Sequence, residues 1–199
     1  MSRFSTRTPL AITLVLAIAL TTVVVADSRG AHPQELDHAS ALAAFERIKK
    51  LEGTWQAKST KGWEERQQFR VIAKGTAVSS QSVPVPSADA SKADTAPKAQ
   101  MLTVFHMDGD HLLLTHYCEA GNQPRMIAAA IDDAGRTVHF TFLDATNMGA
   151  RMMGHMHAVV MRFVDDNHFD EQWSWYEDGK EQWMETVHNE RMPSAAGQP

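Results

Sequence analysis

The chain has 199 residues, a formal net charge of -5 at pH 7, 43% hydrophobic residues and a single cysteine. One cysteine excludes an intrachain disulfide, so an ordinary hydrophobic core must stabilise the fold, and this length suits one domain. The negative charge argues against nucleic acid and anionic membrane surfaces as partners.

The first 26 residues have the layout of a cleavable secretory signal peptide. Arg3 and Arg7 form a positive start, Leu10–Val25 is an uncharged apolar run, and the small residue Ala26 precedes a polar stretch. The alternative is an uncleaved anchor, but the apolar run is shorter than the roughly 20 residues that cross a bilayer. We therefore expect an exported protein, periplasmic or secreted, with no membrane span after cleavage. Losing the two arginines changes the formal net charge of the mature chain, residues 27–199, from -5 to -7.

A short helix is expected next, because apolar residues recur every three positions between His38 and Leu51. This spacing predicts an amphipathic helix over residues 38–51 whose apolar stripe consists of Leu42, Phe45, Ile48 and Leu51. Gly53 follows, as is typical just after the end of a helix.

Beyond Gly53 the apolar residues alternate with a period of two, which predicts strands. We expect strands over residues 53–59, 63–72, 76–83, 101–107, 111–118, 124–131, 136–144, 155–164, 168–177 and 180–188. Residues 84–99, rich in Ala, Ser, Asp and Pro, predict a mobile loop within the same domain.

The connections between these strands favour one fold class. Most of them are tight turns, which join antiparallel neighbours, and a closed sheet leaves no edge strand unpaired. The sequence therefore predicts a mostly β protein: an antiparallel up-and-down β-barrel of about ten strands with a short N-terminal helix. A two-sheet sandwich is the competing fold, but it would need long crossover connections, and few are present.

The tripeptide Gly53-Thr54-Trp55, at the start of the first predicted strand, resembles the Gly-x-Trp opening of lipocalins and related calycin barrels. In that superfamily the tryptophan closes the barrel floor and an arginine near the last strand packs over its ring. Arg191 is at the matching position, so the resemblance implies structural roles for Gly53, Trp55 and Arg191. Over residues 40–192 the chain resembles small bacterial exported lipocalin-like proteins of unassigned function. Nitrobindin-type haem barrels share the same opening.

A barrel of ten strands encloses more volume than its own side chains need to fill, so it can hold a small, partly apolar ligand. The alternative is a lumen packed solid by large side chains, since the chain contains 11 Met and 5 Trp.

Polar residues interrupt an apolar strand between positions 116 and 125, and they predict one set of ligand contacts. His116 and Tyr117 would lie near the rim of the lumen, with Asn122 and Arg125 on the adjoining loop. An arginine at a cavity mouth can pair with a carboxylate or phosphate group of a ligand. The alternative is an ordinary turn in which Arg125 pairs with Glu119.

His155 and His157 lie two apart on a predicted strand, so both imidazoles would point the same way, with Cα atoms about 6.6 Å apart. They are candidates for ligand binding and for a metal site, which needs a third ligand. Candidates for that third ligand are His106, His116 and His139. A hairpin loop at residues 108–110 would place His116 opposite Leu102 and keep it far from His106. The alternative reading is pocket-lining or surface histidines.

Other chemistry-bearing patterns are weak. Cys118 has no adjacent His or Lys and is expected to be an inert buried thiol. Trp173, Trp175 and Trp183 predict an aromatic cluster in the core or the lumen wall. We find no paired-carboxylate arrangement, glycine-rich phosphate loop, CxxC or GxSxG motif.

The function expected from these observations is that of an exported barrel that binds a small molecule of unknown identity. The anchors would be the polar residues already introduced, namely His116, Tyr117, Asn122, Arg125, His155 and His157. The alternatives are a metal- or haem-binding protein that uses His155 and His157, a barrel enzyme of unassigned reaction, and an envelope protein without a ligand. The absence of an identifiable acid–base or nucleophile pair favours binding over catalysis. The residues indicate neither a cofactor nor an oligomeric state.

Overall fold

The structure, a computed structural model, describes residues 36–86, 97–132, 135–148 and 154–193. The predicted signal peptide and the middle of the predicted 84–99 loop lie outside the described residues.

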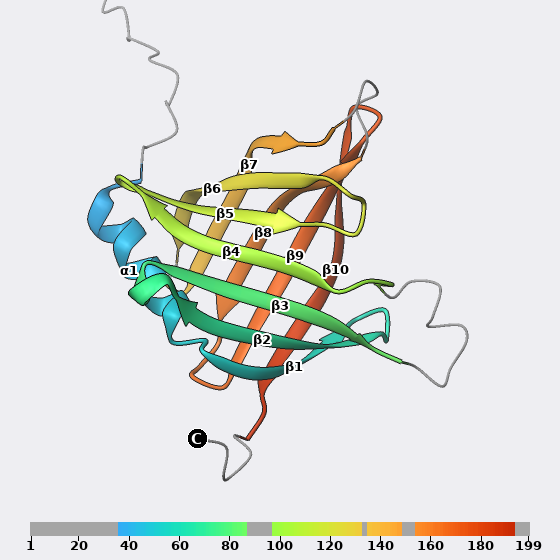
Figure 1. The fold of residues 1–199 in the computed structure, drawn as a ribbon, viewed down its shortest axis with the longest axis horizontal. Coiled ribbons are helices and arrows are strands. Elements are labelled where there is room, and N and C mark those ends of the chain that lie inside the picture. The colour runs from blue at the N-terminus through green and yellow to red at the C-terminus, as the bar shows by residue number, and fades with distance from the viewer. Residues whose placement is uncertain (1–35, 87–96, 133–134, 149–153, 194–199) are drawn as a thin grey trace, which may run out of the picture. The chain divides into compact units, whose positions relative to one another are not determined.

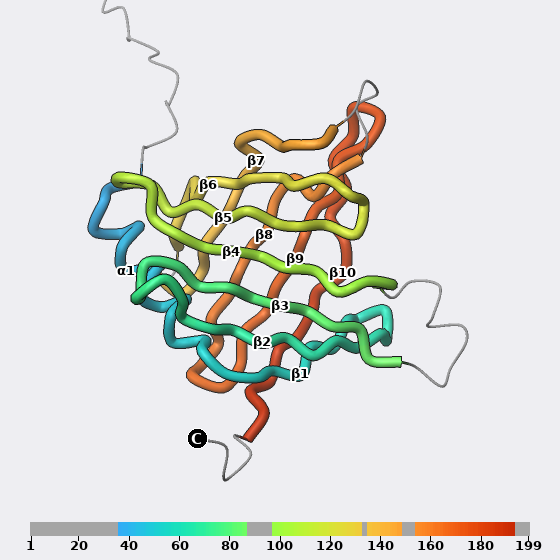
Figure 2. Tube along the Cα trace, viewed as in Figure 1, coloured from blue at the N-terminus to red at the C-terminus, as the bar shows by residue number. Residues whose placement is uncertain are grey.

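Segments in which buried and exposed residues alternate form ten strands, and these strands close into an antiparallel barrel (Figures 1 and 2). Each strand pairs with its neighbours along the chain, and the first pairs with the last. The elements are α1 (His38–Lys49), β1 (Gly53–Ser59), β2 (Glu64–Ile72), the 3-10 turn η1 (Ala73–Gly75), β3 (Ala77–Val85), β4 (Met101–Asp108), β5 (His111–Tyr117), β6 (Gln123–Asp132), β7 (Thr137–Thr146), β8 (His155–Phe163), β9 (His168–Glu177) and β10 (Lys180–Arg191). The predicted fold class is confirmed, with strand boundaries mostly within two residues of those expected.

The register between β4 and β5 differs from the predicted one by one residue. Asp108 pairs with His111, so the turn has two residues, and Gly109 has a positive φ of 58°. A residue that adopts positive φ easily is what a tight two-residue hairpin turn requires. His116 therefore lies opposite Thr103 rather than Leu102.

Helix α1 covers one end of the barrel, where it packs against β4, β5 and β6 (Figure 1). Asp37 caps its N-terminus by accepting a hydrogen bond from the backbone N–H of Ser40 (2.9 Å). The buried face consists of Ala41, Ala44, Phe45 and Ile48. The predicted stripe was wrong at Leu42, which is 40% exposed. The two alanines face the barrel instead, and small side chains let a helix approach it closely.

Below α1, aromatic side chains fill the closed end of the barrel. Trp55, Phe69 and Phe169 pack edge to face, with ring centres 4.8–6.5 Å apart. The Trp55 Nε1 donates a hydrogen bond to the carbonyl oxygen of Leu51 (2.7 Å). All three aromatic residues are at most 1% exposed. This end of the barrel is a packed aromatic core.

Arg191, at the end of β10, packs against the same end of the barrel from outside. Its Cζ lies 4.2 Å from the centre of the Trp55 ring. Its guanidinium donates hydrogen bonds to the carbonyl oxygens of Lys50, Glu52 and Asp166 at 2.7, 2.8 and 3.0 Å. The side chain thus ties together the segment after α1, the β8–β9 turn and the barrel floor.

Gly53 is required beside this arginine for a steric reason. Its φ is +134°, and a Cβ atom there would lie 2.9 Å from Arg191 Nη1. Trp55 and Arg191 therefore lie in the ring-to-guanidinium contact expected for them, and Gly53 leaves room for the guanidinium.

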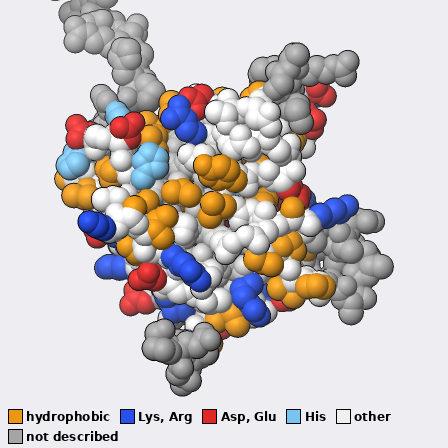
Figure 3. All heavy atoms as spheres, in the orientation of Figure 1, with side chains coloured by type: hydrophobic (Ala, Val, Ile, Leu, Met, Phe, Trp, Pro, Cys, Tyr) orange, Lys and Arg blue, Asp and Glu red, His pale blue; other side chains and the backbone are white. Residues whose placement is uncertain are grey.

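On the face shown in Figure 3, acidic and basic side chains are interspersed and hydrophobic ones are scattered among them. Within the part of the chain that the structure describes, no helix is both long and apolar enough to traverse a bilayer.

Candidate functional site

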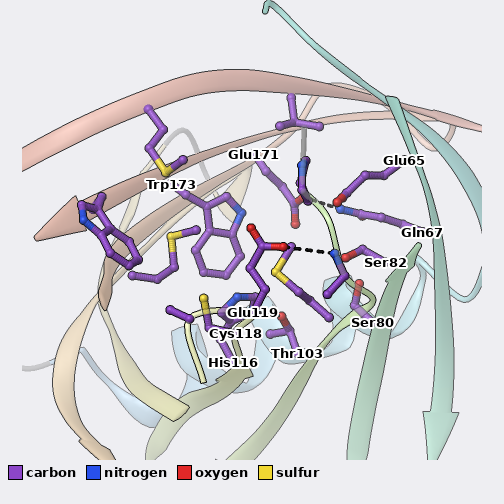
Figure 4. A pocket seen from close by; sticks show the side chains of 18 of the residues that line it. Glu65, Gln67, Ser80, Ser82, Thr103, His116, Cys118, Glu119, Glu171 and Trp173 are labelled. Carbon is purple, nitrogen blue, oxygen red and sulfur yellow. Dashed lines mark hydrogen bonds between the residues drawn. The ribbon is translucent and has the colours of Figure 1, made fainter. Parts of the chain in front are cut away.

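The half of the barrel away from α1 contains a cavity of about 720 Å³ (Figure 4). Its lining comes from β2, β3, β4, β5, β8, β9 and β10 and from residues 97–99 near the mouth. The expected alternative of a solidly packed lumen is therefore wrong. The volume falls within the roughly 300–1,000 Å³ that small-molecule sites occupy.

The cavity exists because the inward-facing residues change in size along the strands. At the closed end β2, β4 and β9 carry phenylalanines, whereas β3 and β4 carry Ser80, Ser82 and Thr103 nearer the mouth. On β1 the inward position after Trp55 is Ala57, which is fully buried. Small side chains on adjacent strands leave the central space unfilled.

A pair of buried carboxyl groups lies in this cavity, on β2 and β9. Glu65 and Glu171 are each 4% exposed, and Gln67 lies near both (Figure 4). The Gln67 Nε2 donates a hydrogen bond to Glu171 Oε2 (2.8 Å). Among the described residues, Glu65 Oε1 and Gln67 Oε1 have no hydrogen-bond partner. The sequence-based expectation that no paired carboxylates exist is therefore wrong.

Burial changes the acidity of both carboxyl groups. It raises the pKa of Glu65 to about 7, with further contributions from the negative charges of Glu171 and Glu119. Burial also raises the pKa of Glu171 to about 7, although hydrogen bonds from Gln67 and Asn189 favour the ionised form and lower this pKa in part. Near neutral pH the pair thus takes up or releases protons readily.

Glu185, on β10, faces the same cavity but has partners for its charge. Its Oε1 accepts a hydrogen bond from Trp63 Nε1 (2.7 Å), and its Oε2 lies 3.0 Å from Lys61 Nζ. Burial alone would raise the pKa of Glu185, but hydrogen bonds from its own backbone N–H, Lys61 and Trp63 lower it overall. Glu185 is therefore a neutralised carboxylate, unlike Glu65 and Glu171.

His116, on β5, is a buried neutral imidazole. Its Nδ1 lies 2.9 Å from Thr103 Oγ1, and its ring centre lies 4.8 Å from that of Trp173. Burial lowers the pKa of His116 to about 4, so the ring is uncharged near neutral pH. Its Nε2 has no partner in the described part of the chain. The imidazole therefore offers one free nitrogen to the lumen.

The rest of the cavity wall is aromatic and sulfur-rich. It consists of Trp63, Phe105, Trp173, Trp175, Met101, Met156, Met184 and Val187. Trp183 is 50% exposed and lies opposite Ser174, so the predicted cluster of three tryptophans is wrong in that member. Cys118 also lines the wall, and burial raises the pKa of its thiol. The thiol therefore stays protonated and is a poor nucleophile.

Of the six predicted anchors, His116 alone is among the residues that line the cavity. Tyr117 is 48% exposed. Asn122 is fully buried and donates a hydrogen bond to the Gly154 carbonyl oxygen (2.9 Å). Arg125 forms a two-pronged pair with Asp144 on β7. The expected Arg125 partner, Glu119, instead accepts hydrogen bonds from the backbone N–H groups of residues 98 and 99 at the mouth.

His155 and His157 lie together, but outside the cavity lining. His155 Nε2 is 3.1 Å from His157 Nδ1, and both rings contact Phe142 and Tyr176 at 4.4–5.5 Å between ring centres. The chain has a bulge between Met156 and Ala158, which interrupts the strict alternation of side chains.

The residues considered as a third metal ligand do not join this pair. His106 Nδ1 lies 3.2 Å from the Met107 carbonyl oxygen, and His139 Nε2 lies 2.8 Å from Asp132 Oδ2. His116 is inside the cavity. Among the described residues, no group of three or more His, Cys, Asp or Glu side chains is placed to hold a metal ion.

No family model and no curated protein matches this chain. A solved structure described as EF1p2_mFAP2b bound to DFHBI is similar at 10% sequence identity and a TM-score of 0.34, covering 75% of this chain and 98% of that one. A likeness this weak carries no information about a ligand. The closed ten-stranded antiparallel barrel itself fits a calycin-like fold.

Proposed function

We propose that this protein is an exported lipocalin-like barrel that binds a small, partly apolar molecule. The observation that carries the proposal is the cavity of about 720 Å³ inside the barrel. The signal-like first 26 residues and the Gly53-Thr54-Trp55 opening support export and kinship with lipocalin-like proteins.

The chemistry of the lining supports binding. An apolar wall with a few convergent polar groups is typical of small-molecule sites. Within the described residues, Glu65, Gln67 and His116 each keep a buried polar atom without a partner. Leaving such an atom unsatisfied costs about 1–3 kcal/mol. A ligand that forms those hydrogen bonds would recover this free energy, which favours binding in the cavity.

Binding of Nile red, an uncharged apolar dye, tests the proposal. We expect a saturable rise in its fluorescence with the wild-type protein. Ser82→Phe places a phenyl ring in the lumen and should weaken binding by about tenfold or more, a loss of about 1.4 kcal/mol. Ser79→Phe is the matched control, because Ser79 lies on the same strand with its side chain on the opposite face.

The control variant should bind the dye as the wild type does. Equal binding by wild type and Ser82→Phe would show that the dye binds elsewhere, and absence of binding would contradict the proposal outright. Circular dichroism of each variant checks that the barrel has formed.

A further inference from the structure

We propose that the cavity selects organic cations: a protonated amine on an apolar body, with its N–H groups donating to Glu65 and Glu171. This inference rests on the proposed small-molecule binding and specifies the chemical class of the ligand.

The unpartnered groups at the site are mainly acceptors. Gln67 donates its Nε2 hydrogen to Glu171, and its Oε1 and the Oε1 of Glu65 have no donor among the residues that the structure describes. Both side chains are more than nine-tenths buried and line the cavity. A carboxylate or carbonyl ligand would bring more acceptors to the same place. A ligand with several N–H donors satisfies them.

The charges around the cavity are also unbalanced. The charged side chains that line it or pair with its lining are Glu65, Glu119, Glu171, Glu185, Lys61 and Lys98. Lys61 neutralises Glu185. Within the described residues no Lys or Arg forms an ion pair with Glu65 or Glu171. The missing positive charge therefore has to come from solvent protons or from a ligand.

Lys98, near the mouth, is the one cation among the described residues that line the cavity, and the walls around the carboxyl pair do not oppose a cation. His116 is uncharged near neutral pH, so it does not repel an ammonium group. Trp63, Trp173 and Trp175 line the cavity. The faces of indole rings attract cations, and their surfaces pack against an apolar chain. The arrangement therefore suits an amphipathic amine with its charged end at the carboxyl pair.

Three molecules with one apolar body test this inference: octylamine, octanol and octanoate. Isothermal titration of each into the protein at pH 8 gives their affinities. We expect octylamine to bind about tenfold or more tighter than octanol. This factor corresponds to the lower end of the coupling energies found for close charge pairs at interfaces. Octanoate should bind weakest, because it brings a third negative charge to the pair.

The variant that removes both charges is Glu65→Gln combined with Glu171→Gln. It should bind octylamine and octanol about equally and still bind Nile red, which shows that the barrel is intact. Glu64→Gln is the matched control, because Glu64 is the neighbour of Glu65 but accepts from Gln56 and does not line the cavity. It should keep the preference for the amine.

Acidification provides an independent readout. Between pH 8 and pH 5.5 the carboxyl pair gains protons while octylamine stays charged, so the preference for octylamine over octanol should shrink. Equal affinities at pH 8, with Nile red still bound, would overturn the cation inference and leave small-molecule binding standing. Tightest binding of octanoate would overturn it as well. Failure of Nile red and of all three octyl compounds to bind would overturn both proposals.

Discussion

The same strands form both halves of the barrel, but their inward-facing side chains are aromatic in the closed half and include carboxyl groups in the open half. On β9 Phe169 faces inward in the closed half, and the next residue on the same face, Glu171, lies nearer the mouth. On β2 the corresponding inward residues are Phe69 and, two inward positions away, Glu65. In an antiparallel strand two residues span only about 7 Å, so the environment changes from a packed aromatic core to a polar cavity within a short distance.

This contrast indicates that stability and function are separated along the barrel axis. The closed half consists of apolar side chains with satisfied polar atoms, such as Trp55 Nε1 on the Leu51 carbonyl. The open half retains buried carboxyl groups that burial destabilises in their charged form. Binding sites commonly reduce stability in this way. Removing a buried carboxyl group in the open half should therefore stabilise the protein, whereas removing a buried aromatic side chain in the closed half should destabilise it.

The largest effect is expected in the closed half, from Trp55→Ala. It removes the edge-to-face contacts with Phe69 and Phe169 and the surface under Arg191. We expect a loss of about 3–5 kcal/mol in the free energy of unfolding, as for other large-to-small core substitutions. Urea unfolding followed by circular dichroism measures it. Trp183→Ala, at a half-exposed tryptophan, is the control and should change stability by less than about 0.5 kcal/mol.

In the open half, Glu171→Gln should instead stabilise the protein at pH 8. The folded-state pKa of Glu171, about 7, lies above the ordinary value of 4.5. The folded protein therefore binds more protons than the unfolded chain between these values, and its free energy of unfolding falls as pH rises through this window. Glutamine resembles the protonated carboxyl and does not titrate. We expect a gain on the order of 3 kcal/mol at pH 8 from a shift of this size.

Urea titrations of wild type and Glu171→Gln at pH 5 and pH 8 measure this effect. At pH 5 the two proteins should be nearly equally stable, because the wild-type carboxyl is then largely protonated, so the pH 5 pair serves as the control. A variant that is less stable than wild type at pH 8 would show that the carboxylate is well solvated or paired in the folded state.

The closed half and the overall fold could be predicted from the sequence because they depend on local patterns. Alternating residues and tight turns placed the ten strands, and the spacing after His38 placed the helix. The partner of His116 could not be placed, since a turn one residue shorter than expected shifts the β4–β5 register.

The candidate site could be predicted only in part. Glu65 and Glu171 alternate with aromatic residues, Trp63 just before β2 and Phe69 on it, and Phe169 and Trp173 on β9, which indicates an inward position for each. Their approach to one another depends on barrel closure, which joins segments far apart in the sequence. Sequence alternation also gave no warning of the bulge beside His157, so the positions of His155 and His157 could not follow from a period of two.

The smallest effect is expected from Thr103→Val in the open half. It removes the hydroxyl 2.9 Å from His116 Nδ1 while keeping the shape of the side chain. We expect a loss of about 1 kcal/mol, the usual net value of one hydrogen bond. Thr141→Val, at an exposed position on β7, is the control and should be close to neutral. Nitrogen-15 NMR of the His116 ring reports which nitrogen carries the proton, and this distribution should change in Thr103→Val only. Unchanged imidazole chemical shifts would show that Thr103 does not determine which His116 nitrogen carries the proton. A ligand in the cavity would then have to select the protonation of His116 Nε2.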